Sequence, residues 1–327
     1  MIQRRTLLAT AAAGLALPAL AQPRGFPNKP VRLVVPYAPG GGTDAMARAL
    51  AQKLATLWSQ PVVVENKPGA SESIAASNVA RAPADGYSLL FASDSTFQLN
   101  PLLYTRLPYD PDKDLVPITR FALGPFALIV NSNMPVANFK EFLAYARQRE
   151  RKLAYGSFGV ANSTNLGLSW ISRQFGLDMV HAPFAGQGPA NLALLSGEID
   201  VMLGNIVPSS IGFIQQGKIK VLATSGATRL PHAPEIPTFT ELGYKNIDTA
   251  YSLGLAAPAG TPAAVMDKIA ADVKRAVSDP ELIAYASETL SLQLFAENAQ
   301  QYRDFIASSR RSLEERIKAA GIGKLDQ

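Results

Sequence analysis

The amino-acid sequence predicts an α/β fold arranged in two lobes. Short β-branched runs alternate with single amphipathic helices over residues 31–92, and a second alternating series runs from about residue 126 to 249. Strands that are separated by single helices imply parallel pairing with right-handed crossovers. Apolar strands near 125–131 and 250–257 flank the middle series, so we expect the chain to cross between the lobes there.

These crossings give the expected domains. Residues 22–125 plus 250–327 would form the first lobe and residues 126–249 the second, with a ligand cleft between the two. The strands expected in the first lobe lie at 31–35, 62–64 and 88–92, and its helices begin at Thr43, which could act as the N-cap, and at Ile74. The strands expected in the second lobe lie at 126–130, 152–155, 178–180, 199–203 and 220–223. Its helices begin near Asn138, Ser163, Pro189 and Pro208, and helices at 262–278, 280–289 and 298–320 close the chain.

Residues 1–21 have the pattern of a secretory signal peptide. Arg4 and Arg5 precede an apolar run from Leu7 to Leu17, and a small-x-small site permits cleavage after Ala21. The apolar run is shorter than the roughly 20 residues that span a bilayer. The start fits the Sec route and also resembles a twin-arginine signal, and we expect a periplasmic destination.

Composition narrows the function classes. Removing residues 1–21 from the 327-residue chain leaves 306 residues, and because that segment holds two of the 31 basic side chains, 29 basic and 26 acidic ones remain. This mild positive charge, with no dense Lys/Arg stripe, argues against nucleic acid as a partner. The chain has no Cys, which excludes disulfides and a Cys-linked lipid anchor.

Two stretches resemble a nucleotide-binding loop and a calcium-binding loop, but each lacks residues that its motif requires. Residues 212–218 fit the pattern G-x-x-x-x-G-K, but Ile219 stands where Ser or Thr would hold Mg²⁺, and a helix runs into a strand there. Residues 110–114 imitate the start of a calcium loop, but Leu115 and Phe121 stand where Gly and Glu are required. We therefore expect neither a metal nor a cofactor.

The chemistry-bearing residues form no recognisable catalytic set. The two histidines, His181 and His232, have no evident Ser or Asp partner in the sequence, and there is no G-x-S-x-G elbow and no Cys nucleophile. We expect no catalysis. An exported hydrolase or isomerase of unknown type, or a ligand sensor, remains the alternative to a binding protein.

A glycine-rich turn follows the first expected strand. Gly40, Gly41 and Gly42 would let the backbone approach a ligand, and the helix from Thr43 offers unpaired N–H groups with positive dipole character. Such a turn can hold a carboxylate without arginine, although a plain tight turn is the alternative. A second turn, Gly69-Ala70-Ser71, follows the neighbouring strand.

Motifs along the whole mature chain carry a family resemblance. The chain resembles the Bug or TctC-like periplasmic receptors of tripartite tricarboxylate transporters. The matching stretches, in order, are Val34–Asp44, Glu65–Ala70, Ala84–Tyr87, Asn100–Leu103, Tyr155–Ser157 with Gly159, Gly197–Asp200, Ile236–Thr238 with Glu241 and Gly243, and Ala257–Pro262. The resemblance implies a two-lobed clamshell of the periplasmic binding protein type that closes on a small carboxylate. It also implies delivery to the membrane subunits of such a transporter, and we expect a monomer.

The resemblance implies a ligand pincer between the lobes. Both glycine turns would form the jaw of the first lobe, and the Ser157–Thr164 segment with the loop at Phe184 would form the jaw of the second; helix capping is the alternative role for the Ser/Asn/Thr cluster. The expected ligand-binding residues are Tyr37, Gly40, Gly41, Gly42, Thr43, Asp44, Gly69, Ala70, Ser71, Glu72, Ser93, Asp94, Ser157, Gly159, Asn162, Ser163, Thr164, Phe184, Gly186 and Asn205.

The chain departs from the family pattern at four places. Ser71-Glu72-Ser73 stands where glycines are usual, Asp94 follows the third strand, Asn165 stands where His is frequent, and Gly204 where an acid is common. A dicarboxylate facing Glu72 or Asp94 would meet like charge in a poorly solvated cleft. We therefore hypothesise a ligand with a cationic or hydrogen-bond-donating end, as in an amino acid or amide. The alternative is that both acids point outward and cap helices or turns.

Overall fold

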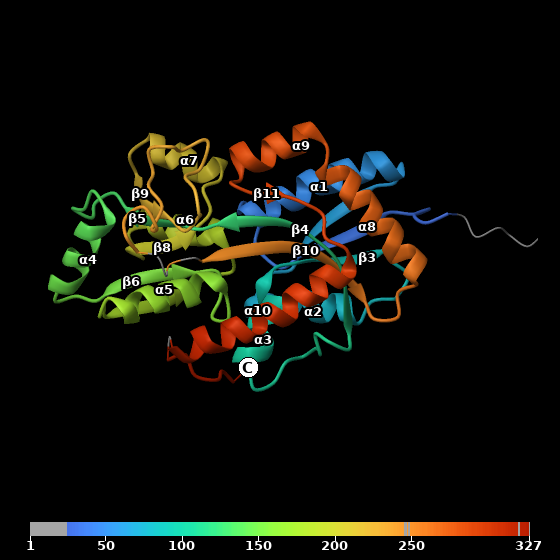
Figure 1. Ribbon diagram of the computed structural model, residues 1–327, viewed down its shortest axis with the longest axis horizontal. Helices are drawn as coiled ribbons and strands as arrows, with labels where there is room; N and C mark the ends of the chain where they lie inside the picture. The colour runs from blue at the N-terminus through green and yellow to red at the C-terminus, as the bar shows by residue number, and fades with distance from the viewer. Residues whose placement is uncertain (1–24, 245–246, 248, 320, 327) are drawn as a thin grey trace, which may run out of the picture.

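The computed structural model describes residues 25–244, 247, 249–319 and 321–326, and it contains two β-sheets, each covered by helices. The two sheets form the cores of two lobes that lie side by side, with the second lobe at the left of the view (Figure 1). The expected signal peptide lies outside the described residues. Within the part of the chain that is described, no helix is long and apolar enough to cross a membrane.

The first lobe is built on a six-stranded sheet in the order β11-β4-β10-β3-β1-β2. Its first three strands pair in parallel, as expected, with Leu33 opposite Val64 on one side and Leu89 on the other. The strand β10 is antiparallel to both of its neighbours. The bounds are β1 Val31–Val35, β2 Val62–Asn66, β3 Ser88–Ala92, β4 Leu115–Pro125, β10 Ala250–Pro258 and β11 Gln293–Leu294.

Helices from both ends of the chain cover this sheet. Trp58 Nε1, at the end of α1, donates to Asp272 of α8 at 2.7 Å, which ties the N-terminal and C-terminal parts together. The helices are α1 Gly42–Trp58, α2 Ser73–Ala80, α3 Asn100–Leu103, α8 Ala263–Val277, α9 Pro280–Ala284 and α10 Ala299–Ala319, with short irregular turns at Ala70–Glu72, Ser95–Leu99 and Tyr285–Thr289.

The second lobe holds a five-stranded sheet in the order β7-β6-β8-β5-β9. Phe139 begins α4 and packs edge-on against Phe239, with Asn138 capping the helix by accepting from the N–H of Glu141. The strands are β5 Ala127–Asn131, β6 Leu153–Ser157, β7 Met179–Pro183, β8 Val201–Gly204 and β9 Ile219–Thr224. The helices are α4 Phe139–Gln148, α5 Ser163–Gln174, α6 Gln187–Ser196 and α7 Pro208–Gln215.

The chain passes from the first sheet to the second between Pro125, the last residue of β4, and Ala127, the first residue of β5. The strand β4 pairs with β10 in the first sheet and was not expected from the sequence, whereas β5 lies within the second sheet. Pro117 and Gly124 interrupt the apolar pattern of β4, and its pairing with β10 shifts register twice, so the strand lacks a regular alternation.

The last long helix contacts both lobes. In Figure 1, α10 runs from beneath the first sheet toward α5 of the second lobe. Its Ile317 belongs to a small apolar cluster with Leu99 of the first lobe and Leu166 of the second. This helix therefore packs across the junction between the lobes, in addition to the chain segments that join them after β4 and before β10.

Candidate functional site

The turn after β1 is held by a buried acid. Gly40 adopts a φ of +92°, which favours glycine, and its N–H donates to Asp44 at 3.2 Å. Asp44 also accepts from Asn66 at 2.9 Å and pairs with Arg48 at 2.9 Å. Burial opposes its ionisation, yet the bonds from Arg48, Asn66 and Gly40 together lower the pKa of Asp44. Asp44 thus shapes the turn.

The expected cap of α1 is wrong. The N-cap is Gly41, with φ −93°, and no side chain caps the helix, because the chain reaches its helical conformation one residue before Thr43. The glycines face the second lobe. A Cβ atom on Gly41 would meet Cβ of Gln187 at 3.2 Å, and one on Gly42 would meet Val207 at 3.1 Å.

The turn after β2 has an unusual backbone. Ala70, Ser71 and Glu72 have φ values of +45°, +47° and +76°, a left-handed conformation that costs non-glycine residues on the order of 1–3 kcal/mol each. Asn100 Nδ2 donates to the carbonyl of Ser71 at 2.8 Å and helps to hold this turn. Strained backbone that persists in a fold is over-determined by its surroundings and often marks a functional site.

This turn directs Glu72 into the first lobe, where its side chain is 1% exposed. Tyr37 and Ser93 each donate a hydroxyl to one carboxylate oxygen, Oε1. The other oxygen, Oε2, accepts from the Thr96 hydroxyl at 2.5 Å and from the N–H groups of Thr96 and Ser93 at 3.2 and 3.4 Å. Burial, together with the Glu72 charge, raises the pKa of Tyr37 well above its ordinary value, so this hydroxyl stays protonated.

Asn162 reaches this cluster from the second lobe. Its Oδ1 caps α5 by accepting from the N–H of Thr164 at 3.0 Å. Its Nδ2 donates to the Tyr37 hydroxyl at 3.0 Å and to Ser95 at 3.3 Å, both in the first lobe. The Asn162 side chain therefore caps α5 with its oxygen and contacts the first lobe with its nitrogen.

A cavity of about 300 Å³ lies between the two jaws. The N–H of Ala161 in the second lobe donates to Ser71 Oγ in the first lobe at 3.0 Å, and Tyr104 donates to the same hydroxyl at 3.3 Å. Gly159 approaches so closely that a Cβ there would lie 2.8 Å from Ser71 Oγ. The wall is formed by Pro36, Gly69, Ala70, Ser71, Glu72, Tyr104, Phe158, Gly159, Val160, Pro183, Phe184 and Ala185.

Eighteen of the twenty expected site residues divide into three groups, and the other two, Asp94 and Ser163, line a second cavity. Those that line this cavity are Gly69, Ala70, Ser71, Glu72, Gly159 and Phe184. Those that support its walls are Tyr37, Ser93, Ser157, Asn162 and Thr164; Ser157 Oγ, for example, bonds the Gly159 carbonyl at 2.9 Å. The third group is absent from the described lining and lies at or just before the N-terminus of α1, or in the turns before α6 and α7 of the second lobe: Gly40, Gly41, Gly42, Thr43, Asp44, Gly186 and Asn205.

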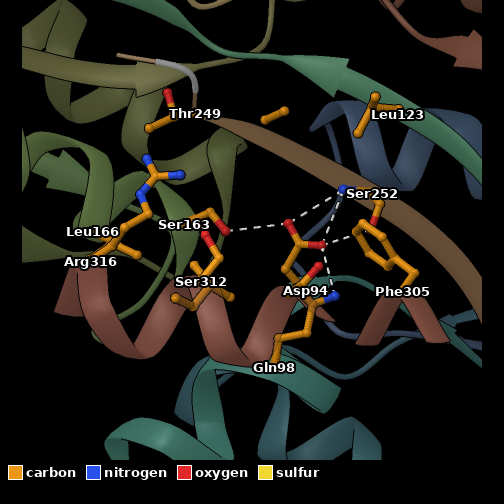
Figure 2. Close-up of a pocket in the computed structure, with 13 residues that line it drawn as sticks. Asp94, Gln98, Leu123, Ser163, Leu166, Thr249, Ser252, Phe305, Ser312 and Arg316 are labelled. Carbon is orange, nitrogen blue, oxygen red and sulfur yellow. Dashed lines mark hydrogen bonds between the residues drawn. The ribbon is translucent and has the colours of Figure 1, made fainter. Parts of the chain in front are cut away.

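Asp94 and Ser163 line a second cavity of about 200 Å³ against α10 (Figure 2). Ser252 of β10 donates its hydroxyl to Asp94 at 2.7 Å, and Ser163 donates from the second lobe at 3.3 Å. Burial raises the pKa of Asp94 to about 6; the Glu72 charge adds to this and the bonds from Ser252 oppose it. Asp94 is 7% exposed, so neither it nor Glu72 points outward as a simple cap.

Several residues at the site were missed from the sequence. Thr96 and Ser252 hold the two buried acids, Tyr104 lines the cavity, and Gln187 bonds the backbone of Asn205 from both ends of its amide. None belongs to a motif with its own chemistry. Asn100 carried a signal, since Asn100–Leu103 is one of the stretches behind the family resemblance.

Each histidine has a serine partner, which corrects the expectation that neither has one. His181 Nε2 lies 2.7 Å from Ser157 Oγ, and His232 Nε2 lies 3.2 Å from Ser291 Oγ. The partners are more than 20 residues away in the chain, so only the fold brings them together. Burial lowers the pKa of both histidines, which favours neutral rings. Among the described residues, no group of three or more His, Cys, Asp or Glu side chains could hold a metal ion.

Known proteins resemble this chain over most of its length. The family model for the tripartite tricarboxylate transporter family receptor matches residues 46–322. A UPF0065 protein of Bordetella pertussis is 36% identical over 260 residues, which is 80% of each chain. A UPF0065 protein of Cupriavidus necator is 34% identical over 317 residues, covering 97% of this chain and 95% of the relative.

Solved structures share the same architecture. The periplasmic binding protein BugD is 30% identical with a TM-score of 0.86, covering 92% of this chain and 100% of that one. A protein of R. palustris solved with adipate is 30% identical with a TM-score of 0.87 and the same coverage. MatC of Rhodopseudomonas palustris, solved with malate, is 28% identical with a TM-score of 0.83, covering 89% of this chain and 100% of MatC.

These similarities confirm the two-lobed fold and the family resemblance derived from the motifs. They also confirm that the protein is not an enzyme, because the family and its structural neighbours are periplasmic solute-binding proteins. With the family model matching residues 46–322 and full-length relatives above 30% identity, the chain belongs to the tripartite tricarboxylate transporter receptor family.

Proposed function

We propose that this protein is a periplasmic receptor that closes on one small carboxylate-bearing solute, an organic acid, an amino acid or an amide. It would then pass the solute to the membrane subunits of a tripartite tricarboxylate-type transporter. The observation that carries the proposal is the 300 Å³ cavity, to which turns of both lobes contribute walls. Its volume falls at the lower end of the roughly 300–1,000 Å³ typical of small-molecule sites.

The chemistry of the cavity wall supports an acidic solute. Turns at strand ends present peptide N–H groups, which hold a carboxylate without a basic side chain. The proposed contacts are Gly69, Ala70 and Ser71 from the first lobe, with Gly159 and Phe184 from the second. Two structural neighbours were solved with adipate and with malate, and these ligands support a carboxylate for this chain as well.

The proposed movement is a hinge closure. Residues 22–125 plus 250–327 would move as one body and 126–249 as the other, with the chain passing between them after the end of β4 and before the start of β10. The solute would stabilise the closed state because it contacts both jaws. We propose a monomer that reaches the periplasm by means of a cleaved N-terminal signal peptide, through the Sec or the twin-arginine route.

A thermal-shift screen of the mature chain tests this function. Organic acids, amino acids and amides are each added at millimolar concentration, and positives are followed by calorimetry and by mass analysis of the recovered solute. We expect a rise in melting temperature for a narrow set of carboxylates, with the solute recovered unchanged. Conversion of the solute, or stabilisation by none of these compounds, would refute the proposal.

Delivery needs a separate test. Cells that express the transporter subunits are compared with and without the receptor for uptake of the solute found in the screen. Uptake should depend on the receptor, and uptake that is equal in both strains would argue for a sensing role instead.

A further inference from the structure

The Glu72 carboxylate occupies a site that is built to hold an anion. Five donors converge on its two oxygens, from Tyr37 after β1, from Ser93 after β3 and from Thr96 in the turn that follows. An ionised carboxylate offers about four lone-pair positions, so these donors saturate it. No donor comes from the turn that carries Glu72 itself, so the first lobe supplies a complete anion site into which that turn inserts a side chain.

The backbone conformation of residues 70–72 fixes the direction of the Glu72 side chain. Ala70, Ser71 and Glu72 are held at positive φ, a conformation that glycine adopts without strain and other residues do not. The three residues also line the solute cavity. The strained turn therefore places the Glu72 side chain through the cavity wall and into the anion site.

The surroundings already hold excess negative charge. Among the described residues that line the solute cavity, Glu72 is the one acidic or basic side chain. Asp94 is close enough for the Glu72 charge to contribute to its raised pKa, and the ion pairs of the described residues include neither acid. A second carboxylate on the solute would be repelled by these acids in a poorly solvated cavity. The hydrogen-bond donors that could hold it are already bound to Glu72.

From this geometry we propose that Glu72 acts as a built-in ligand that fills the anion site of Tyr37, Ser93 and Thr96 and limits the solute to one acidic group. The inference rests on the proposed receptor function and narrows its substrate class. The solute has a single carboxylate, and the end of the solute that faces Glu72 is neutral or donates hydrogen bonds. Dicarboxylates are excluded because the chain's own carboxylate has taken the second position.

The Glu72→Gly variant tests the anion site without knowledge of the natural solute. Glycine suits the φ of +76° at this position, and removal of the side chain leaves the five donors buried without an acceptor. We expect acetate or formate at 10–100 mM to raise the melting temperature of Glu72→Gly by several degrees. The wild-type protein and Glu72→Gln, in which the site stays filled, should not respond.

Paired solutes test the limit to one acidic group. Butyrate against succinate and hexanoate against adipate differ by one carboxylate at equal chain length. We expect the wild-type protein to bind a monoacid at least tenfold more tightly than its diacid, and Glu72→Gly to gain at least tenfold for the diacid, while Glu72→Gln gains nothing.

The outcomes separate this inference from the receptor function. If the wild-type protein binds diacids as tightly as monoacids, the limit to one acidic group is wrong and the receptor function stands. If the wild-type protein binds no acid, the receptor function fails, and the acetate response of Glu72→Gly still decides whether the anion site exists. If Glu72→Gly does not fold, the comparison of paired acids on the wild-type protein alone is sufficient to overturn the inference.

Discussion

At the scale of the residue, the site is distinguished by two buried acids that hydroxyl and N–H groups hold instead of cations. Glu72 takes its donors from Tyr37, Ser93 and Thr96, and Asp94 takes its closest donor from Ser252. Burying a charge without a counter-ion is unfavourable, and a raised pKa is one consequence. Asp94 shows that consequence.

The pKa of Asp94 predicts how stability depends on pH. Its folded value of about 6 lies above the ordinary value of 3.8, so the folded state binds more protons than the unfolded state between these limits. The residue therefore destabilises the fold increasingly as pH rises from about 4 to 6, by on the order of 3 kcal/mol in total. Below pH 4 this destabilisation is absent.

The Asp94→Asn variant should lose that dependence. We expect the difference in unfolding free energy between variant and wild type to grow in favour of the variant from pH 4 to pH 7, measured by urea denaturation. Asp178→Asn, at a side chain that is 73% exposed, is the control and should follow the wild type. If unfolding free energy varies with pH in the same way for Asp94→Asn and the wild type, the pKa of Asp94 is not raised by folding.

At the scale of the element, the N-terminus of α5 combines a structural and a functional task. Asn162 caps the helix with its oxygen and reaches Tyr37 and Ser95 with its nitrogen. Asn138 caps α4 in the same lobe through the N–H of Glu141, and its Nδ2 bonds the side chain of the same residue. The two caps are chemically alike, and only Asn162 bridges the lobes.

This pair gives a matched prediction. Asn162→Ala and Asn138→Ala should each lower the unfolding free energy by about 1 kcal/mol, the usual effect of losing a cap. Only Asn162→Ala should also weaken binding of the solute, by about tenfold, because it removes the bonds to the first lobe. Calorimetry measures the solute affinity of both variants, and urea denaturation measures their stability. If Asn162→Ala and Asn138→Ala bind the solute equally well, the role of Asn162 is helix capping alone.

At the scale of the whole molecule, closure depends on close backbone approach between the lobes. Gly41 has an extended conformation that any residue can adopt, so a side chain there leaves the first lobe intact. A Cβ at this position would meet Gln187 of the second lobe at 3.2 Å, and the branches of valine would reach further into it. The lobes could then close only incompletely.

The Gly41→Val variant should therefore fold and fail to bind. We expect at least a tenfold loss of affinity and, by small-angle X-ray scattering, no decrease in radius of gyration on adding the solute. Gly212→Val, in α7, is the control because a Cβ there meets nothing within 4 Å. If Gly41→Val binds the solute as tightly as the wild type does, the close approach of Gly41 to Gln187 is not needed for closure.

The sequence alone determined the family and the order of most helices and strands. Periodicity is local, and β1, β3 and α5 therefore begin where their patterns predict. The motifs spread from Val34 to Pro262 identified the family, since their order along the chain is specific even where each motif is weak. The turns expected to bind the solute at residues 69–72 and 159 do line the cavity.

Only the tertiary structure decided which residues meet. Tyr37, Glu72, Ser93 and Thr96 lie up to 59 residues apart, and no local pattern signals that three of them donate to the fourth. The strand β4 was likewise hidden, because its pairing with β10 joins positions more than 120 residues apart and tolerates Pro117 and Gly124. Hydrogen-bond partners are set by packing in three dimensions, whereas the sequence displays only neighbours along the chain.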